Sequence, residues 1–181
     1  MKRLQRDSVL ISLIEALRDR GSWCGETHMQ KISYFLQELL EVPLSFNFIL
    51  YKHGPYSFDL SDTLAQMEAD FLIRPVPKSP YGPTITIEPT GKRFREKFPK
   101  TNRKYKGAVD FVAKKLAEKN VAELERIATA MYVTLNENSI VDVSNRAEKI
   151  HHLKPHLSLD QAIEAVKEFD QIKFEAQRIQ N

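Results

Sequence analysis

The chain has 181 residues, of which 42% are hydrophobic and 28% charged, a composition typical of a folded protein. Its length allows one sizeable domain, or a small domain with an appended helical region. The longest apolar runs span only a few residues, which excludes a membrane-spanning helix. The single cysteine, Cys24, excludes an internal disulfide and predicts a reducing, cytoplasmic location.

The net charge of +3 is concentrated in one segment. Residues 92–106 contain eight Lys or Arg residues and one Glu, whereas the flanking parts of the chain each contain more acidic than basic residues. This basic segment is compatible with a solvated surface, with contact to phosphates, or with docking onto an acidic partner.

The N-terminal segment is basic and then apolar, but charged residues interrupt it at helical spacing and no small-residue cleavage site follows. We therefore predict an amphipathic helix that Ser8 caps and Gly21 ends, rather than a signal peptide. A second helix is predicted over residues 27–41, where Thr27 and Gln30 have the spacing of a capping box.

Residues 46–52, with the sequence FNFILYK, are rich in aromatic and β-branched residues, which predicts a strand. The pair Gly54-Pro55 is expected to break this strand in a turn, and Ser57 is placed to cap a helix over residues 57–70. The residues of this helix expected to face inward are Leu60, Leu64, Met67 and Phe71.

Residues 71–76 and 84–88 predict two strands, and the turn-rich segment 78–83, KSPYGP, joins them as a wing. A short helix is predicted at 91–98. The order helix, helix, strand, helix, strand, wing, strand, helix is that of a winged-helix domain, apart from the position of the first strand.

From about residue 103 the chain is predicted to be helical. Two further capping boxes, Asn120 with Glu123 and Ser158 with Gln161, open helices. The residues predicted to face inward in these helices are Val121, Leu124, Ile127, Ala128, Met131 and Leu135, followed by Leu159, Ala162, Ile163, Val166, Phe169 and Ile172.

The predicted fold class is therefore α+β and mainly helical. A winged-helix-like N-terminal domain is predicted at 1–102 and an α-helical C-terminal region at 103–181. The segment 99–107 is the candidate linker, and 154–158, KPHLS, is predicted to be a turn.

Two motifs connect the N-terminal part to a known family: QKISYFLQ at 30–37, and YKHGPYS at 51–57, followed by Leu60 and then by FLI. Residues 28–98 resemble the SocA-like (Panacea) antitoxin domain and related phage-associated bacterial proteins. The residues that match the family's Lys-(Leu/Ile)-x-Tyr helix and its Gly-Pro turn are Lys31, Ile32, Tyr34, Gly54 and Pro55. The resemblance implies a protein-binding role, as an antitoxin that neutralises a toxin or as an adaptor that carries one to a protease.

The candidate partner-binding site is centred on the Gly-Pro-Tyr-Ser turn, because loops at the starts of helices often carry function. Tyr56 is expected to be exposed and to act as the binding anchor. The same four residues are also compatible with a turn that has only a structural role. The predicted partner-binding residues are Gly54, Pro55, Tyr56, Ser57, Asp59, Asp62 and Gln66.

The alternative function is that of a winged-helix DNA-binding regulator. Helix 57–70 is unsuited to a DNA groove, because it has four acidic residues and neither Lys nor Arg. Any DNA contact would therefore use the wing and the basic segment. The residues predicted for it are Lys78, Lys92, Arg93, Lys97, Lys100 and Arg103.

No enzymatic activity, cofactor or metal is predicted. His53, Ser57 and Asp59 are residue types of a hydrolase triad but lie within seven positions of one another, and there is no nucleophile-elbow motif. Cys24 with His28 is better explained as a buried cysteine near a histidine. The segment 151–156, HHLKPH, has histidines at zinc spacing, but Pro155 interrupts a helix there. No phosphate-binding or dinucleotide-binding glycine pattern occurs.

Overall fold

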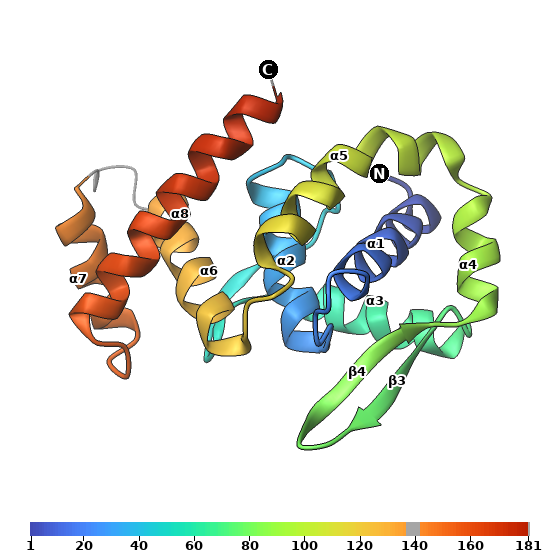
Figure 1. The fold of residues 1–181 in the computed structure, drawn as a ribbon, viewed down its shortest axis with the longest axis horizontal. Coiled ribbons are helices and arrows are strands. Elements are labelled where there is room, and N and C mark those ends of the chain that lie inside the picture. The colour runs from blue at the N-terminus through green and yellow to red at the C-terminus, as the bar shows by residue number, and fades with distance from the viewer. Residues whose placement is uncertain (137–141, 181) are drawn as a thin grey trace.

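The computed structural model describes residues 1–136 and 142–180 (Figure 1). The helices in this part of the chain are α1 (Arg3–Arg18), α2 (Glu26–Glu38), α3 (Phe58–Ala69), α4 (Pro89–Glu96), α5 (Pro99–Leu116), α6 (Val121–Asn136), α7 (Val143–Leu153) and α8 (Leu159–Gln180). The strands are β1 (Ile49–Tyr51), β2 (Gly54–Tyr56), β3 (Ile73–Lys78) and β4 (Tyr81–Ile87). The fold is α+β and mainly helical, as predicted.

The strands form two separate antiparallel hairpins, β1–β2 and β3–β4. The second hairpin follows α3 directly, in the position predicted for the wing, and it projects from the helices (Figure 1). The middle of β4 is attached to α1 and to the segment after it, because Arg18 donates hydrogen bonds to the Thr84 hydroxyl and to the Ile85 carbonyl. The Ile85 amide donates in turn to the Cys24 carbonyl at 2.9 Å.

The helices α1 and α2 form the centre of the core. α1 contacts α4 and α5, and α2 contacts α5 and α6 (Figure 1). α6, α7 and α8 pack against one another beside α2. Phe35 of α2 and Phe169 of α8, both fully buried, meet edge to face with ring centroids 6.3 Å apart. None of the helices described here has the length and apolar composition needed to cross a lipid bilayer.

The N-terminal helix begins earlier than predicted. α1 starts at Arg3, so Ser8 is not its cap but a buried interior residue, and its hydroxyl donates to Asn102 Oδ1 at 2.8 Å. The predicted end is confirmed: Gly21 has φ +78°, a conformation that glycine adopts without strain, and its amide donates to the Arg18 carbonyl.

The helix that the sequence places at 57–70 is confirmed as α3. Ser57 is its N-cap, with Oγ accepting a hydrogen bond from the Leu60 amide at 3.3 Å. Phe71 was predicted to face inward and this is wrong. It adopts φ +55°, which turns the chain out of the helix and leaves the side chain 73% exposed. The inward residues confirmed as buried are Leu60, Leu64 and Met67.

The candidate linker at 99–107 is wrong, because these residues form the first half of α5. Residues 102 and 103, between which the sequence places the domain boundary, both lie within this helix. α5 contacts α1, α2 and α8, so it packs against elements from both predicted regions.

Both C-terminal capping boxes are confirmed. The Asn120 amide donates to Glu123 at 2.7 Å and the Glu123 amide donates back to Asn120 at 3.0 Å, and Ser158 and Gln161 repeat the arrangement. Of the residues predicted to face inward, the first of each helix is instead exposed, because it lies at the helix start beyond the core. These residues are Val121 and Leu159.

Candidate functional site

The Gly-Pro segment is part of a hairpin rather than the break at the end of a strand. The strand predicted at 46–52 is shortened to β1, and β2 begins at Gly54 and pairs with β1 in antiparallel register. Lys52 and His53 connect the two strands. The prediction failed because the glycine and the proline themselves pair with β1, with Leu50 opposite Pro55.

Gly54 is required where the hairpin touches α6. It has φ +84°, and a Cβ atom there would lie 3.1 Å from Thr129 Oγ1 and 3.4 Å from the Glu125 carbonyl oxygen. A side chain at this position would therefore strain the backbone and also crowd the helix. Because Gly54 has no side chain, the hairpin can pack directly against α6.

Gln30 of α2 attaches the residue that follows the hairpin. Its side-chain amide donates to the Ser57 carbonyl and its side-chain oxygen accepts from the Ser57 amide, both at 2.9 Å. The predicted capping box with Thr27 is therefore wrong: Gly25 is the N-cap of α2, and no side chain caps it. Gln30 instead bonds to the buried amide and carbonyl of Ser57, in the way that the backbone of a neighbouring strand would.

Lys31, the next residue of α2, bonds to the Gly-Pro segment from the buried side of the hairpin. Its side chain is buried, with 2% of the residue exposed, and Nζ donates to the Pro55 carbonyl at 2.8 Å. Burial lowers the pKa of Lys31 to about 8, although the nearby Glu125 carboxylate acts in the opposite direction. Lys31 thus supplies a charge-assisted bond to the segment at a cost in desolvation.

Three distant segments meet at Glu125 of α6, which is 7% exposed. Its carboxylate lies 3.3 Å from His53 Nδ1 in the hairpin and 3.3 Å from His156 Nε2 in the turn after α7. Lys154 of the same turn donates to the carbonyls of Tyr51 and Lys52. The C-terminal helices therefore help to hold the hairpin. Sequence reasoning missed this role, because neither Glu125 nor Lys154 belongs to a recognisable motif.

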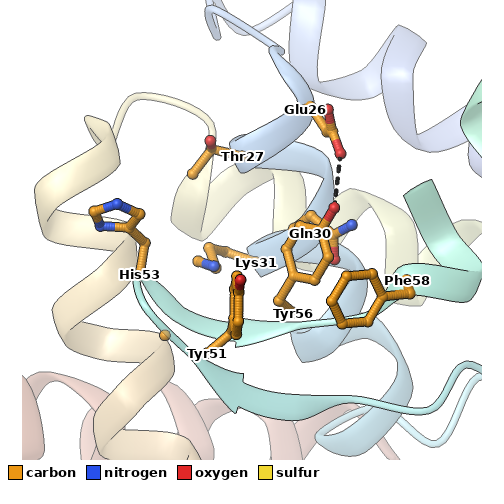
Figure 2. A pocket seen from close by; sticks show the side chains of 9 residues that line it. Glu26, Thr27, Gln30, Lys31, Tyr51, His53, Tyr56 and Phe58 are labelled. Atoms are coloured by element: carbon orange, nitrogen blue, oxygen red, sulfur yellow. Dashed lines mark hydrogen bonds between the residues drawn. The ribbon is translucent and has the colours of Figure 1, made fainter.

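The outer side of the hairpin and the first residue of α3 together carry three aromatic side chains, Tyr51, Tyr56 and Phe58, which we call the aromatic cluster. Their ring centroids lie 5.1 to 5.9 Å apart. Tyr51 is 54% exposed and Phe58 is 55% exposed, and Tyr56 is half-buried between them. The Tyr56 hydroxyl donates to Glu26 of α2 at 3.3 Å (Figure 2).

The aromatic cluster borders a hollow of about 290 Å³ between α2 and the hairpin (Figure 2). Glu26 lies at one end of it, beyond Tyr56, and His53 lies at the other, with Lys31 between them. The residues that line the hollow are Glu26, Thr27, Gln30, Lys31, Tyr51, His53, Gly54, Tyr56 and Phe58.

The predicted partner-binding residues divide into two groups. Gly54, Pro55 and Ser57 are buried, so these residues serve the hairpin and the start of α3. The remaining four reach the surface: Tyr56 in part, and Asp59, Asp62 and Gln66 fully. Sequence reasoning missed Tyr51 and Phe58, although the spacing of aromatics in 51-YKHGPYSF-58 could have indicated them.

The residues predicted for DNA binding are all exposed. Lys78 lies at the end of β3, where its ammonium stacks on the Trp23 ring at 4.6 Å from the centroid. The others follow one another along α4 and the start of α5. These are Lys92, Arg93, Lys97, Lys100 and Arg103.

The residues considered for catalysis have other roles. Burial raises the pKa of the Cys24 thiol to about 12 and lowers that of His28, so the pair is unsuited to nucleophilic attack. The Ser57 hydroxyl caps α3, and His53 faces Glu125. His152 and His156 do not share a helix, because α7 ends at Leu153. Among the residues with described placement, no group of His, Cys, Asp and Glu could hold a metal ion.

No protein-family model matches the chain, and a search of curated proteins finds no significant match. The resemblance to the SocA-like (Panacea) domain therefore stays a prediction that rests on the motifs themselves.

The stability of the protein is expected to increase with pH between about 8 and 10.5 through Lys31. In this window the unfolded chain still binds the proton, whereas the buried amine of the folded chain has lost it, so the cost of burying the charge is relieved. We expect the free energy of unfolding to rise by up to about 3 kcal/mol relative to a Lys31→Met variant. Urea unfolding of both proteins at pH 7.5 and 10.5 measures it. A difference that does not change with pH would contradict the prediction.

Proposed function

We propose that the protein is a non-enzymatic protein-interaction module of the SocA-like antitoxin or adaptor class, and that it binds its partner through the aromatic cluster and the exposed face of α3. The observation that carries the proposal is a cluster of three adjacent aromatic side chains, of which Tyr51 and Phe58 are each more than half exposed. Clustered aromatics are the most frequent anchors of protein interfaces, and two side chains as large as Tyr51 and Phe58 are rarely left half in water side by side without a role.

Rigidity supports the proposal. Lys31 holds the hairpin and Gln30 holds Ser57, which follows it. Glu125 of α6 and Lys154 of the turn after α7 contact the hairpin from the other side. A preorganised surface loses little conformational entropy when it binds, and this favours recognition of a protein partner. The KHGPYS segment would then present Tyr56 while its buried residues keep the segment in place.

Charge distribution favours a protein over DNA at this surface. The side chains of Asp59, Asp62 and Glu68 on α3 are exposed and would repel phosphates. The alternative, a DNA-binding regulator, would use the exposed basic side chains of α4 and α5 and the wing instead. Duplex DNA binding that is lost in an Arg93→Glu/Lys97→Glu variant would support that alternative.

Replacing Tyr56 with alanine is expected to weaken the partner complex about tenfold or more, because the variant loses a central aromatic anchor. The immobilised protein captures partners from cells of its source organism, and the affinity for the purified partner is then measured by calorimetry. Phe174→Ala is the control, since Phe174 is an exposed aromatic on α8 outside the aromatic cluster, and its affinity should equal that of the wild type. Circular dichroism checks that each variant is folded. Unchanged affinity in both Tyr56→Ala and Tyr51→Ala would contradict the proposal.

A further inference from the structure

The aromatic cluster is surrounded by acidic side chains. Glu26 accepts hydrogen bonds from the Tyr56 hydroxyl at 3.3 Å and from the Ser61 hydroxyl at 2.8 Å, so it lies against both the hairpin and α3. Asp62 lies four residues after Phe58 in α3 and shares its helix face. The exposed rings are thus bordered by carboxylates from two different helices.

Aromatic rings beside carboxylates favour a positively charged ligand. The faces of Tyr and Phe rings carry negative potential and attract cations within about 6 Å of the ring centroid. A carboxylate beside the rings can form an ion pair with a cation that lies on them. If the cation is a guanidinium group, the carboxylate also accepts hydrogen bonds from its N–H groups. Neutral apolar side chains would use the rings but leave the carboxylate without a new partner.

We propose that the aromatic cluster and Glu26 bind an Arg or Lys side chain in a basic segment of the protein partner, an inference that rests on the proposed function. The cation stacks on the exposed ring of Phe58, beside the half-buried Tyr56, and pairs with Glu26, and Asp62 extends the negative surface along α3. The partner segment is therefore basic.

The positive charges near the hollow do not oppose this arrangement. Lys31 has its ammonium buried and bonded to the Pro55 carbonyl, with Glu125 as a counter-charge. His53 lies at the opposite end of the hollow from Glu26 (Figure 2), and its Nδ1 faces the Glu125 carboxylate. A cation that approaches from the Glu26 end meets the rings and a carboxylate first.

The direct test uses a tetra-arginine peptide, with tetra-citrulline as a probe of similar shape without the charge. Binding is followed by NMR through the ring resonances of Tyr51, Tyr56 and Phe58. We expect tetra-arginine to shift these resonances and tetra-citrulline to leave them unchanged. In a Glu26→Gln variant the dissociation constant should increase about fivefold or more, whereas Glu164→Gln, an exposed acid on α8, should bind like the wild type.

The partner complex separates this inference from the proposed function. If Glu26→Gln weakens the complex as Tyr56→Ala does, and Glu164→Gln does not, the inference is supported. If Tyr56→Ala weakens the complex while Glu26→Gln leaves it unchanged, and tetra-arginine shifts no ring of the cluster, the cation site is refuted and the interaction surface stands. If Tyr56→Ala and Tyr51→Ala both leave the complex unchanged, the proposed function itself fails.

Discussion

A Gln30→Leu variant is expected to lose about 3 kcal/mol in the free energy of unfolding, because the Ser57 amide loses its partner and the Ser57 carbonyl keeps only the bond from the Ser61 amide. Ser57 and Gln30 are almost completely buried, so water cannot replace the two bonds. Leucine is close to glutamine in volume, and the loss therefore reports the unsatisfied backbone groups rather than a cavity. Urea unfolding measures the difference from the wild type.

The chain contains a matched control for this effect. Gln37, two helical turns further along α2, makes the same pair of bonds with the amide and the carbonyl of Phe46, each at 2.9 Å. Those bonds are only partly buried, so water can satisfy the groups that Gln37→Leu releases, and we expect a loss of about 1 kcal/mol. Equal losses in the two variants would show that burial of the Ser57 groups is not the cause.

The second large effect is expected for Gly91→Ala in α4, which should lower the free energy of unfolding by about 3 kcal/mol. A Cβ atom on Gly91 would lie 2.1 Å from the Leu72 carbonyl oxygen and 3.1 Å from Ile87 Cγ2. The contact is with backbone, which cannot rotate aside, so α4 must move away from α3 and from the wing. The Glu88 amide, which donates to the same carbonyl at 3.0 Å, would lose its partner.

Gly107→Ala is the control for that variant. Gly107 lies inside α5, and a Cβ atom there would meet nothing within 4 Å. Alanine has the higher helix propensity, so this change should stabilise the protein by about 0.5–1 kcal/mol. Thermal unfolding of the two variants should therefore move in opposite directions. A Gly91→Ala protein as stable as the wild type would mean that α4 is not packed against Leu72.

Features that depend on neighbours along the chain were predictable. The capping boxes at Asn120 and Ser158 and the N-cap at Ser57 involve atoms within three residues of one another, so the local sequence is sufficient to specify them. The wing hairpin was predictable because its two strands follow one another in the sequence and a turn-rich segment joins them. Thr27 with Gln30 has the same pattern as the confirmed boxes, yet Gln30 bonds to Ser57, 27 residues away, where it satisfies a buried amide and gives the buried carbonyl a second donor.

The amino-acid sequence was sufficient for the fold class, the cap of α3, its acidic surface and the position of Tyr56 beside it. The packed structure was needed to find that Gln30 and Lys31 bond to the backbone of Ser57 and Pro55, and that Glu125 meets His53 and His156. The physical reason is the range of the contacts involved. Helix caps and amphipathic periodicity depend on backbone geometry within a few residues, whereas the bond from Lys154 to the hairpin joins positions about a hundred residues apart, and only the packing of α6, α7 and α8 brings them together.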